Sequence, residues 1–166
     1  MSITKKDILI PALLGVVASF GLLGLTIRMM ADKSGDSLDP KEKLQSGDII
    51  FQISTSSQSK AIQLATRSEY SHMGIVYESD GQYFVYEAVQ PVKLTPIDVW
   101  IRRGHNSHYV VKRLEDSETL LTYDALKKMK AIGDRFRGKD YDIYFEWSDE
   151  RIYCSELVWK IYEEAL

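Results

Sequence analysis

A segment near the middle of the chain most constrains its fold, because two strand-like runs flank a tight-turn dipeptide. Residues 71–77 and 82–89 are rich in β-branched and aromatic side chains, and Asp80 and Gly81 stand between them. Aspartate and glycine accept the positive φ angles of a two-residue hairpin turn. The sequence therefore predicts an antiparallel hairpin with these two residues at its tip.

The predicted turn also sets the register of the hairpin. With Ser79 opposite Gln82, Gly74 lies opposite Glu87, and His72 becomes a diagonal neighbour of Glu87 on the same face. Diagonal neighbours have backbones roughly 7–8 Å apart, within reach of two long polar side chains. Gly74 would spare the carboxylate a crowding side chain. A slip of one residue would place His72 and Glu87 on opposite faces.

The chain's only cysteine, Cys154, stands at the start of a helix-like segment near the C-terminus. Leu157, Val158 and Ile161 give this segment an apolar face that would pack on a sheet. The free N–H groups and dipole at a helix N-terminus favour a thiolate over a thiol. We expect a helix packed in this way to bring Cys154 against His72.

These three residues form a candidate nucleophilic site. A thiol needs a base to become a thiolate, and the base needs an orienting partner. Cys154, His72 and Glu87 supply one side chain for each role, and the Cys154 backbone N–H would help to hold an oxyanion. Each residue also has a structural interpretation, as a core cysteine, a satisfied strand histidine, or an edge carboxylate facing water. An unpaired buried carboxylate is costly, and the three together favour catalysis.

The remaining segments predict an α+β domain with an antiparallel sheet. Strands are expected at 49–53 and 108–114, and a short helix is expected to run through Thr66 after a serine-rich start. A longer helix is expected over 118–132, with Ser117 as its N-cap and Gly133 and Gly138 beyond its end. The final helix is expected to begin at Cys154.

The N-terminus differs from the rest of the chain. Lys5 and Lys6 precede an uncharged apolar run over residues 8–27, which Arg28 closes. Twenty helical residues cover roughly 30 Å, about one hydrocarbon core. Two interpretations remain, an uncleaved transmembrane anchor over 1–30 and a cleaved signal peptide, and we favour the anchor.

The same segment predicts where the protein resides. Residues 31–43 are expected to be a linker and 44–166 the globular domain. The two N-terminal lysines favour a cytoplasmic N-terminus, so we expect a single-pass membrane protein whose domain faces the periplasm or cell exterior. Its expected partners are the membrane and a small peptide, amide or lipid substrate. A net charge of −3 argues against nucleic acid.

The histidines outside the candidate site do not predict a metal centre. His105 and His108 lie in a short polar loop, far along the chain from the single cysteine. Zinc sites usually need three or four well-spaced ligands. We therefore do not expect these residues to form a metal centre.

Three segments resemble a known family. Residues 47–51, 72–76 and 153–158 are similar to the circularly permuted NlpC-type, papain-like cysteine hydrolases, in particular the YiiX-like group. In unpermuted members the cysteine helix precedes the strands, whereas here it follows them. The resemblance covers residues 44–166.

The resemblance implies a permuted papain-like fold in which the antiparallel sheet packs on the nucleophile helix. It implies Cys154 as nucleophile, His72 as general base and Glu87 as the group that orients His72. It also implies cleavage of an amide or ester bond through a thioester, without a metal or cofactor.

The substrate stays open between two classes. An anchored, outward-facing domain fits an envelope hydrolase that acts on peptides, and a site beside a bilayer fits a lipid amidase, esterase or acyltransferase. Tyr144, Trp147 and Tyr153 are candidate substrate-binding residues, although aromatic residues before the cysteine helix are equally typical of a core. A non-catalytic binding module on the same fold is a further alternative.

Overall fold

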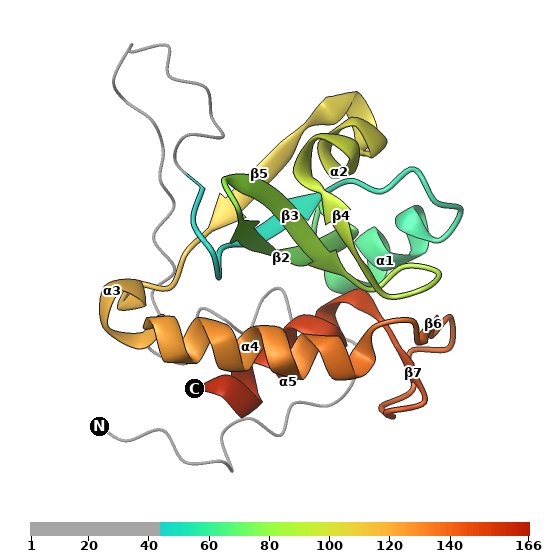
Figure 1. Cartoon of the computed structure of the whole chain (residues 1–166). Coiled ribbons are helices and arrows are strands. Elements are labelled where there is room, and N and C mark those ends of the chain that lie inside the picture. Colours follow the sequence, from blue (N-terminus) through green and yellow to red (C-terminus); the bar gives the residue numbers. More distant parts are fainter. Residues whose placement is uncertain (1–43) are drawn as a thin grey trace, which may run out of the picture.

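A computed structural model describes residues 44–166, which form one sheet with helices on both faces (Figure 1). The five-stranded antiparallel sheet has the order β4-β3-β2-β1-β5. Its strands are β1 (Ile49–Gln52), β2 (His72–Ser79), β3 (Gln82–Glu87), β4 (Lys93–Pro96) and β5 (Tyr109–Lys112), and a second sheet pairs β6 (Asp140–Tyr141) with β7 (Arg151–Ile152). The helices are α1 (Ser59–Thr66), α2 (Ile97–Arg103), the 3-10 helix η4 (His105–Ser107), α3 (Ser117–Leu120), α4 (Tyr123–Phe136) and α5 (Cys154–Ala165).

The β2–β3 hairpin has the register that the sequence predicts. Ser79 pairs with Gln82, and Asp80 and Gly81 form the turn with φ angles of 53° and 73°. The same pairing continued along the strands places Gly74 opposite Glu87. The hairpin thus puts the start of β2 beside the end of β3.

The two faces of the sheet carry different cores, since successive strand residues point to opposite faces. Helices α4 and α5 cover one face and α2 covers the other (Figure 1). The first core includes Ile49, Met73, Ile75, Tyr86, Met129, Leu157 and Ile161. The second includes Leu44, Ile50, Val76, Val85, Ile97 and Trp100.

Two elements lie between the expected strands at 82–89 and 108–114, where no strand or helix is predicted from the sequence. Strand β4 adds to the open edge of β3, and α2 follows it directly. Pro96 supplies a fixed φ at the helix start, and Ile97 and Trp100 then point into the second core. This short helix covers the face of the sheet that α4 and α5 leave open.

The long helix α4 differs from the expected one at both ends. It begins at Tyr123, because the Thr122 side chain accepts a hydrogen bond from Ala125 N at 3.2 Å. Ser117 instead begins the separate helix α3. Gly133 lies inside α4, where an added Cβ would approach the Tyr86 ring to 3.2 Å. The glycine therefore allows close packing on β3 rather than ending the helix.

The expected anchor at 1–30 and linker at 31–43 lie outside the described residues. Within 44–166, each helix is too short or too polar to cross a bilayer.

Replacing Gly74 by alanine should destabilise the fold. The new Cβ would lie 2.5 Å from a Val85 methyl carbon and 2.6 Å from the Tyr86 carbonyl oxygen, and 3.4 Å from Glu87 Cβ. The strand backbone cannot move aside without breaking the hairpin ladder, so we expect a loss of about 2 kcal/mol. Urea unfolding of the full chain measures it. Ser79→Ala, on the exposed end of β2, is the matched control and should change the stability by less than about 0.5 kcal/mol. Equal midpoints for the two variants would contradict this account.

Candidate active site

The hairpin brings His72 and Glu87 into direct contact. His72 Nε2 lies 2.6 Å from Glu87 Oε2, and both side chains are buried. An ionised carboxylate only accepts hydrogen bonds, so Nε2 carries the proton that it donates to Glu87. Nδ1 is then the ring nitrogen available to another group.

Glu87 has two further partners. Thr95 Oγ1 in β4 donates to Glu87 Oε1 at 2.6 Å, and Arg103 Nη2 in α2 donates to Oε2. Burial disfavours the charged carboxylate, but the hydrogen bonds and charges of His72, Arg103 and Thr95 outweigh it and lower the pKa of Glu87 to about 2. Glu87 therefore stays ionised at any pH near neutrality.

Cys154 is the first residue of α5, as the sequence predicts, and its side chain is buried. Burial opposes a charged His72 ring, but hydrogen bonds and charge interactions with Cys154 and Glu87 raise the pKa of His72 to about 9. The ring is therefore held between a thiol group and a carboxylate. An imidazole beside a thiol is the base that a cysteine nucleophile requires.

The three side chains meet at one end of the sheet. Helix α5 packs on the face that α4 also covers, whereas His72 and Glu87 point to the face covered by α2. His72 begins β2, and the Trp100 ring stacks against its imidazole with centroids 6.0 Å apart. The thiol and the imidazole therefore come together around the strand end, from opposite faces.

Tyr141 in β6 also contacts the thiol group. Burial, together with the interactions of its hydroxyl with Cys154 and the nearby charge of Asp142, raises the pKa of Tyr141 above its usual value. The hydroxyl therefore stays protonated and remains a donor beside the sulfur.

The predicted substrate-binding residues occupy three different environments. Tyr144 is 67% exposed. Trp147 packs edge-on against Trp159 with ring centroids 5.0 Å apart, and Tyr153 is buried with its ring 5.3 Å from that of Phe145. The side chains of Tyr144 and Trp147 therefore lie at the surface, whereas Tyr153 packs against Phe145 in the interior.

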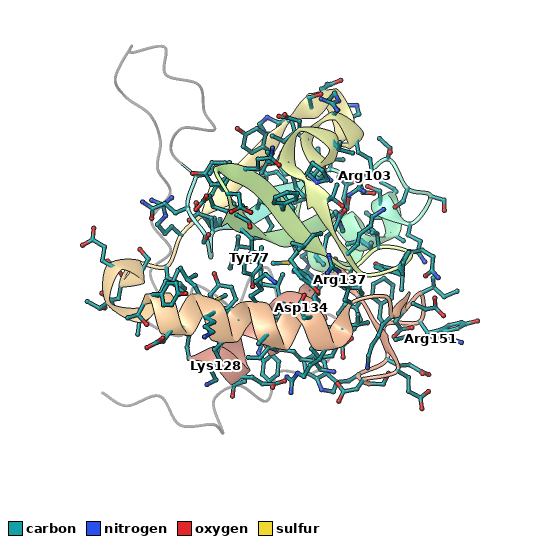
Figure 2. The ribbon with its side chains drawn as sticks, in the orientation of Figure 1. Tyr77, Arg103, Lys128, Asp134, Arg137 and Arg151 are labelled. Carbon is teal, nitrogen blue, oxygen red and sulfur yellow. The ribbon has the colours of Figure 1, made fainter. Side chains whose placement is uncertain are left out.

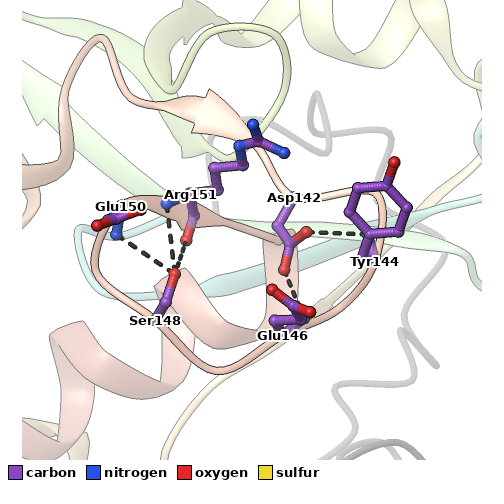
Figure 3. A pocket seen from close by; sticks show the side chains of 6 residues that line it. All are labelled: Asp142, Tyr144, Glu146, Ser148, Glu150 and Arg151. Atoms are coloured by element: carbon purple, nitrogen blue, oxygen red, sulfur yellow. Dashed lines mark hydrogen bonds between the residues drawn. The ribbon is translucent and has the colours of Figure 1, made fainter.

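A pocket of about 390 Å³ lies in the loop between β6 and β7 (Figure 3). Its lining residues are Asp142, Tyr144, Glu146, Ser148, Glu150 and Arg151. Asp142 fixes the loop by accepting hydrogen bonds from Tyr144 N at 2.9 Å and Glu146 N at 2.5 Å. The pocket does not include Cys154, His72 or Glu87, but its loop leads directly into α5.

One buried lysine fastens this loop to the cysteine helix. Lys160 Nζ lies 2.6 Å from Ser148 O, 2.7 Å from Asp149 Oδ1 and 2.8 Å from Glu156 Oε1. Glu156 in turn accepts from Ser148 N at 3.2 Å. These contacts hold the loop between β6 and β7 in a fixed position relative to the start of α5.

Three residues at the site were not identified from the sequence, namely Thr95, Trp100 and Arg103. A local signal existed for α2, since Pro96 is followed by apolar residues at helical spacing, Ile97, Trp100 and Ile101. Nothing in the sequence pattern pairs Arg103 with Glu87 or Tyr141 with Cys154, because these contacts depend on the packing of separate elements.

Comparisons with known proteins agree with this architecture. A family model described as "Permuted papain-like amidase enzyme, YaeF/YiiX, C92 family" matches residues 43–166. The YiiX protein of Escherichia coli (strain K12) is 52% identical over 122 residues, which are 74% of this chain and 59% of that protein. A crystal structure described as metalloprotein yiiX from Escherichia coli O157:H7 has a TM-score of 0.69 and 52% identity, over 74% of this chain and 66% of that chain. This chain spans less than two thirds of the length of either relative.

The His72 ring should titrate near pH 9, which proton–carbon NMR of the full chain measures. His72→Gln identifies the signal among the three histidines. Because the folded pKa is raised from 6.5 to about 9, the charged ring stabilises the fold fully below pH 6.5, and this contribution is lost as the pH rises through about 9.

Cys154→Ala should lower that midpoint, because it removes the hydrogen bond and the charge of the sulfur while Glu87 remains. An unchanged midpoint in this variant would show that the sulfur does not interact with the ring.

Proposed function

Since this chain belongs to the C92 family of permuted papain-like amidases, YaeF/YiiX, we propose that it is a cysteine hydrolase that cleaves amide bonds through Cys154, His72 and Glu87. The single observation that carries the proposal is the buried arrangement of sulfur, imidazole and carboxylate, with Nε2 of His72 2.6 Å from Glu87. Nucleophilic thiols are activated by this combination of an adjacent base and an orienting partner.

The first half of the reaction forms a thioester. His72 Nδ1 takes the thiol proton, and the Cys154 sulfur attacks the substrate carbonyl carbon. The carbonyl oxygen becomes an oxyanion, for which the Cys154 N–H at the start of α5 and the Tyr141 hydroxyl are the nearby donors. The carbon–nitrogen bond then breaks, and His72 gives its proton to the departing amine.

The second half releases the acyl group. Neutral His72 takes a proton from water, and the resulting hydroxide attacks the thioester carbon. The carbon–sulfur bond breaks, the carboxylic acid leaves, and the thiolate is paired again with the imidazolium. Throughout, Glu87 accepts a hydrogen bond from the Nε2–H group of His72, and this contact keeps Nδ1 directed at the sulfur.

The proposed substrate is a peptide or related amide of the cell envelope. The apolar run at residues 8–27 would anchor the domain at the membrane, with the site facing the periplasm or cell exterior. An acylated lipid is the second candidate, and one observation favours it. Ile143, Tyr144 and Trp147 are exposed on the loop before the cysteine helix, where they would contact an acyl chain.

The described residues, 44–166, do not fit a metal centre. The related crystal structure is described as a metalloprotein, but residues 44–166 contain no group of three or more histidine, cysteine or acidic side chains placed to hold an ion. Glu87, the carboxylate beside His72, already receives hydrogen bonds from His72, Thr95 and Arg103. The proposed mechanism therefore uses only the side chains named above.

Replacing Cys154 by alanine should abolish turnover and leave the fold intact, since only the nucleophile is lost. Product release from a mixture of muropeptides by the full chain measures this, with circular dichroism as the check of folding. His105→Ala, outside the site, is the matched control and should keep full activity. Unchanged hydrolysis by the alanine variant would remove Cys154 from the mechanism.

A parallel assay separates the two substrate classes. The full chain is incubated with purified muropeptides and with phospholipid vesicles, and released amines and fatty acids are quantified. We expect cleavage of the peptides. If the vesicles are the true substrate, Tyr144→Ser and Trp147→Ser should lower the release of fatty acids much more than the release of amines from peptides. Fatty-acid release from vesicles without any cleavage of muropeptides would replace the peptide proposal by the lipid one.

A further inference from the structure

We propose that Arg103 is a positioning residue of the reaction, which acts through Glu87 and keeps that carboxylate charged and fixed in every step. This inference rests on the proposed function, because it assigns a role within the same site. Arg103 touches neither the sulfur nor the reacting atoms in the proposed mechanism.

The contact geometry links Arg103 to His72 through one atom. Arg103 Nη2 and His72 Nε2 both donate to Glu87 Oε2, while Thr95 Oγ1 donates to Oε1. Glu87 is completely buried, and the Arg103 side chain is 35% exposed. The guanidinium thus brings a positive charge from the surface to a carboxylate that has no contact with water.

The reaction itself explains why a permanent cation is needed there. A buried carboxylate without a compensating charge is costly and tends to take up a proton. His72 supplies a positive charge only while it is an imidazolium, and the ring is neutral whenever it has given its proton to the leaving amine. Arginine remains charged throughout the physiological range.

Arg103 therefore prevents Glu87 from competing for the catalytic proton. While His72 is neutral, the Nε2 proton is shared with the carboxylate, and the guanidinium favours the ionised form of Glu87. The proton stays on the ring, and Nδ1 remains the basic nitrogen that faces the thiol or the attacking water. Without Arg103, part of the enzyme would hold the proton on Glu87.

The fold holds Arg103 rigidly in place. Arg103 is the last residue of α2, on the side of the sheet opposite α4 (Figure 2). The next residue, Gly104, packs so closely on β1 that an added Cβ would meet Gln52 Oε1 at 2.2 Å. His105 N also donates to Ile53 O at 2.9 Å. The end of α2 is thus fastened to β1 directly beyond the arginine.

The groups that face Glu87 come from every neighbouring element. His72 lies on β2, Thr95 on β4 and Arg103 on α2, and Cys154 on α5 acts through His72. Lys93 pairs with Glu87 in the β3–β4 ladder, but its side chain is exposed. Arg103 is thus the permanent cation in contact with the carboxylate among the described residues.

Three variants of the full chain separate charge from packing. Arg103→Met removes the charge, Arg103→Gln keeps donor atoms without charge, and Arg103→Lys restores the charge. Arg102→Met changes the exposed neighbour on the same helix and is the matched control. Turnover of muropeptides gives kcat and KM. The pH dependence of alkylation by iodoacetamide is a second measurement that needs no substrate, and it reports on Cys154 alone because the chain has a single cysteine.

We expect Arg103→Met and Arg103→Gln to lower kcat by about tenfold, the effect of one pKa unit in the balance between Glu87 and His72, with KM within about twofold. As the pH is lowered, the alkylation rate of these two variants should begin to fall at a higher pH than that of the wild type. Removal of the cation raises the pKa of Glu87, and a protonated Glu87 no longer stabilises the imidazolium. Arg103→Lys should recover most of the activity, and Arg102→Met should match the wild type.

A double variant tests whether Arg103 acts only through Glu87. Glu87→Gln should lower kcat, and adding Arg103→Met to it should cause no further loss, because contacts that act as one unit are not additive. A further tenfold loss in the double variant would show that Arg103 contacts the substrate directly and would overturn the proposed role.

The outcomes distinguish this inference from the proposed function. One outcome overturns the role of Arg103 and leaves the hydrolase proposal standing. In it, the wild type is alkylated quickly at acid pH, and Arg103→Gln and Arg103→Lys both have the same kcat and alkylation profile as Arg102→Met. Slow wild-type alkylation typical of an ordinary thiol, with full activity in Cys154→Ala, overturns the hydrolase proposal itself. If Arg103→Met fails to fold, the contrast between the glutamine and lysine variants decides.

Discussion

The buried carboxylate of Glu87 is the group on which the rest of the site depends. A fully buried negative charge requires hydrogen-bond donors and positive charge from its surroundings, and here β2, β4 and α2 each provide one partner, His72, Thr95 and Arg103. Two of these donors, Thr95 and Arg103, lie in the chain between β3 and η4. Helix α2 also supplies Trp100, whose ring stacks on the imidazole. Helix α2 therefore contributes both a charge that stabilises Glu87 and an aromatic ring that packs against the His72 imidazole at the strand end.

Cys154, the proposed nucleophile, approaches His72 from the other face of the sheet, and it lies near the C-terminal end of the described residues. Helix α5 packs on the core that it shares with α4, and its first residue, Cys154, meets His72 around the end of β2. The order of elements has no effect on this meeting, because packing of α5 on the sheet decides where its N-terminus lies. This is why a permuted chain can assemble the same kind of site as an unpermuted one.

Short sequence patterns predicted those parts of the site whose position depends on residues close together in the chain. Asp80 and Gly81 fixed the hairpin register, and the apolar spacing after Cys154 located the cysteine helix. Strand β4 escaped notice because it is short and ends in Pro96, which is atypical of strands. The pairing of Arg103 with Glu87 was not predictable in the same way, since two residues on different elements meet only after the sheet edge and α2 have packed together.

The lysine that ties the β6–β7 loop to α5 has a consequence for how such a domain diversifies. Lys160 secures the loop through Ser148, Asp149 and Glu156, whereas exposed side chains such as Tyr144 take no part in that fastening. Mutations at the outward positions can therefore accumulate during evolution without displacing the sulfur. With Tyr144 in its proposed substrate-binding role, the residues that select a substrate would differ from those that react with it, and changes in this one loop could then alter specificity.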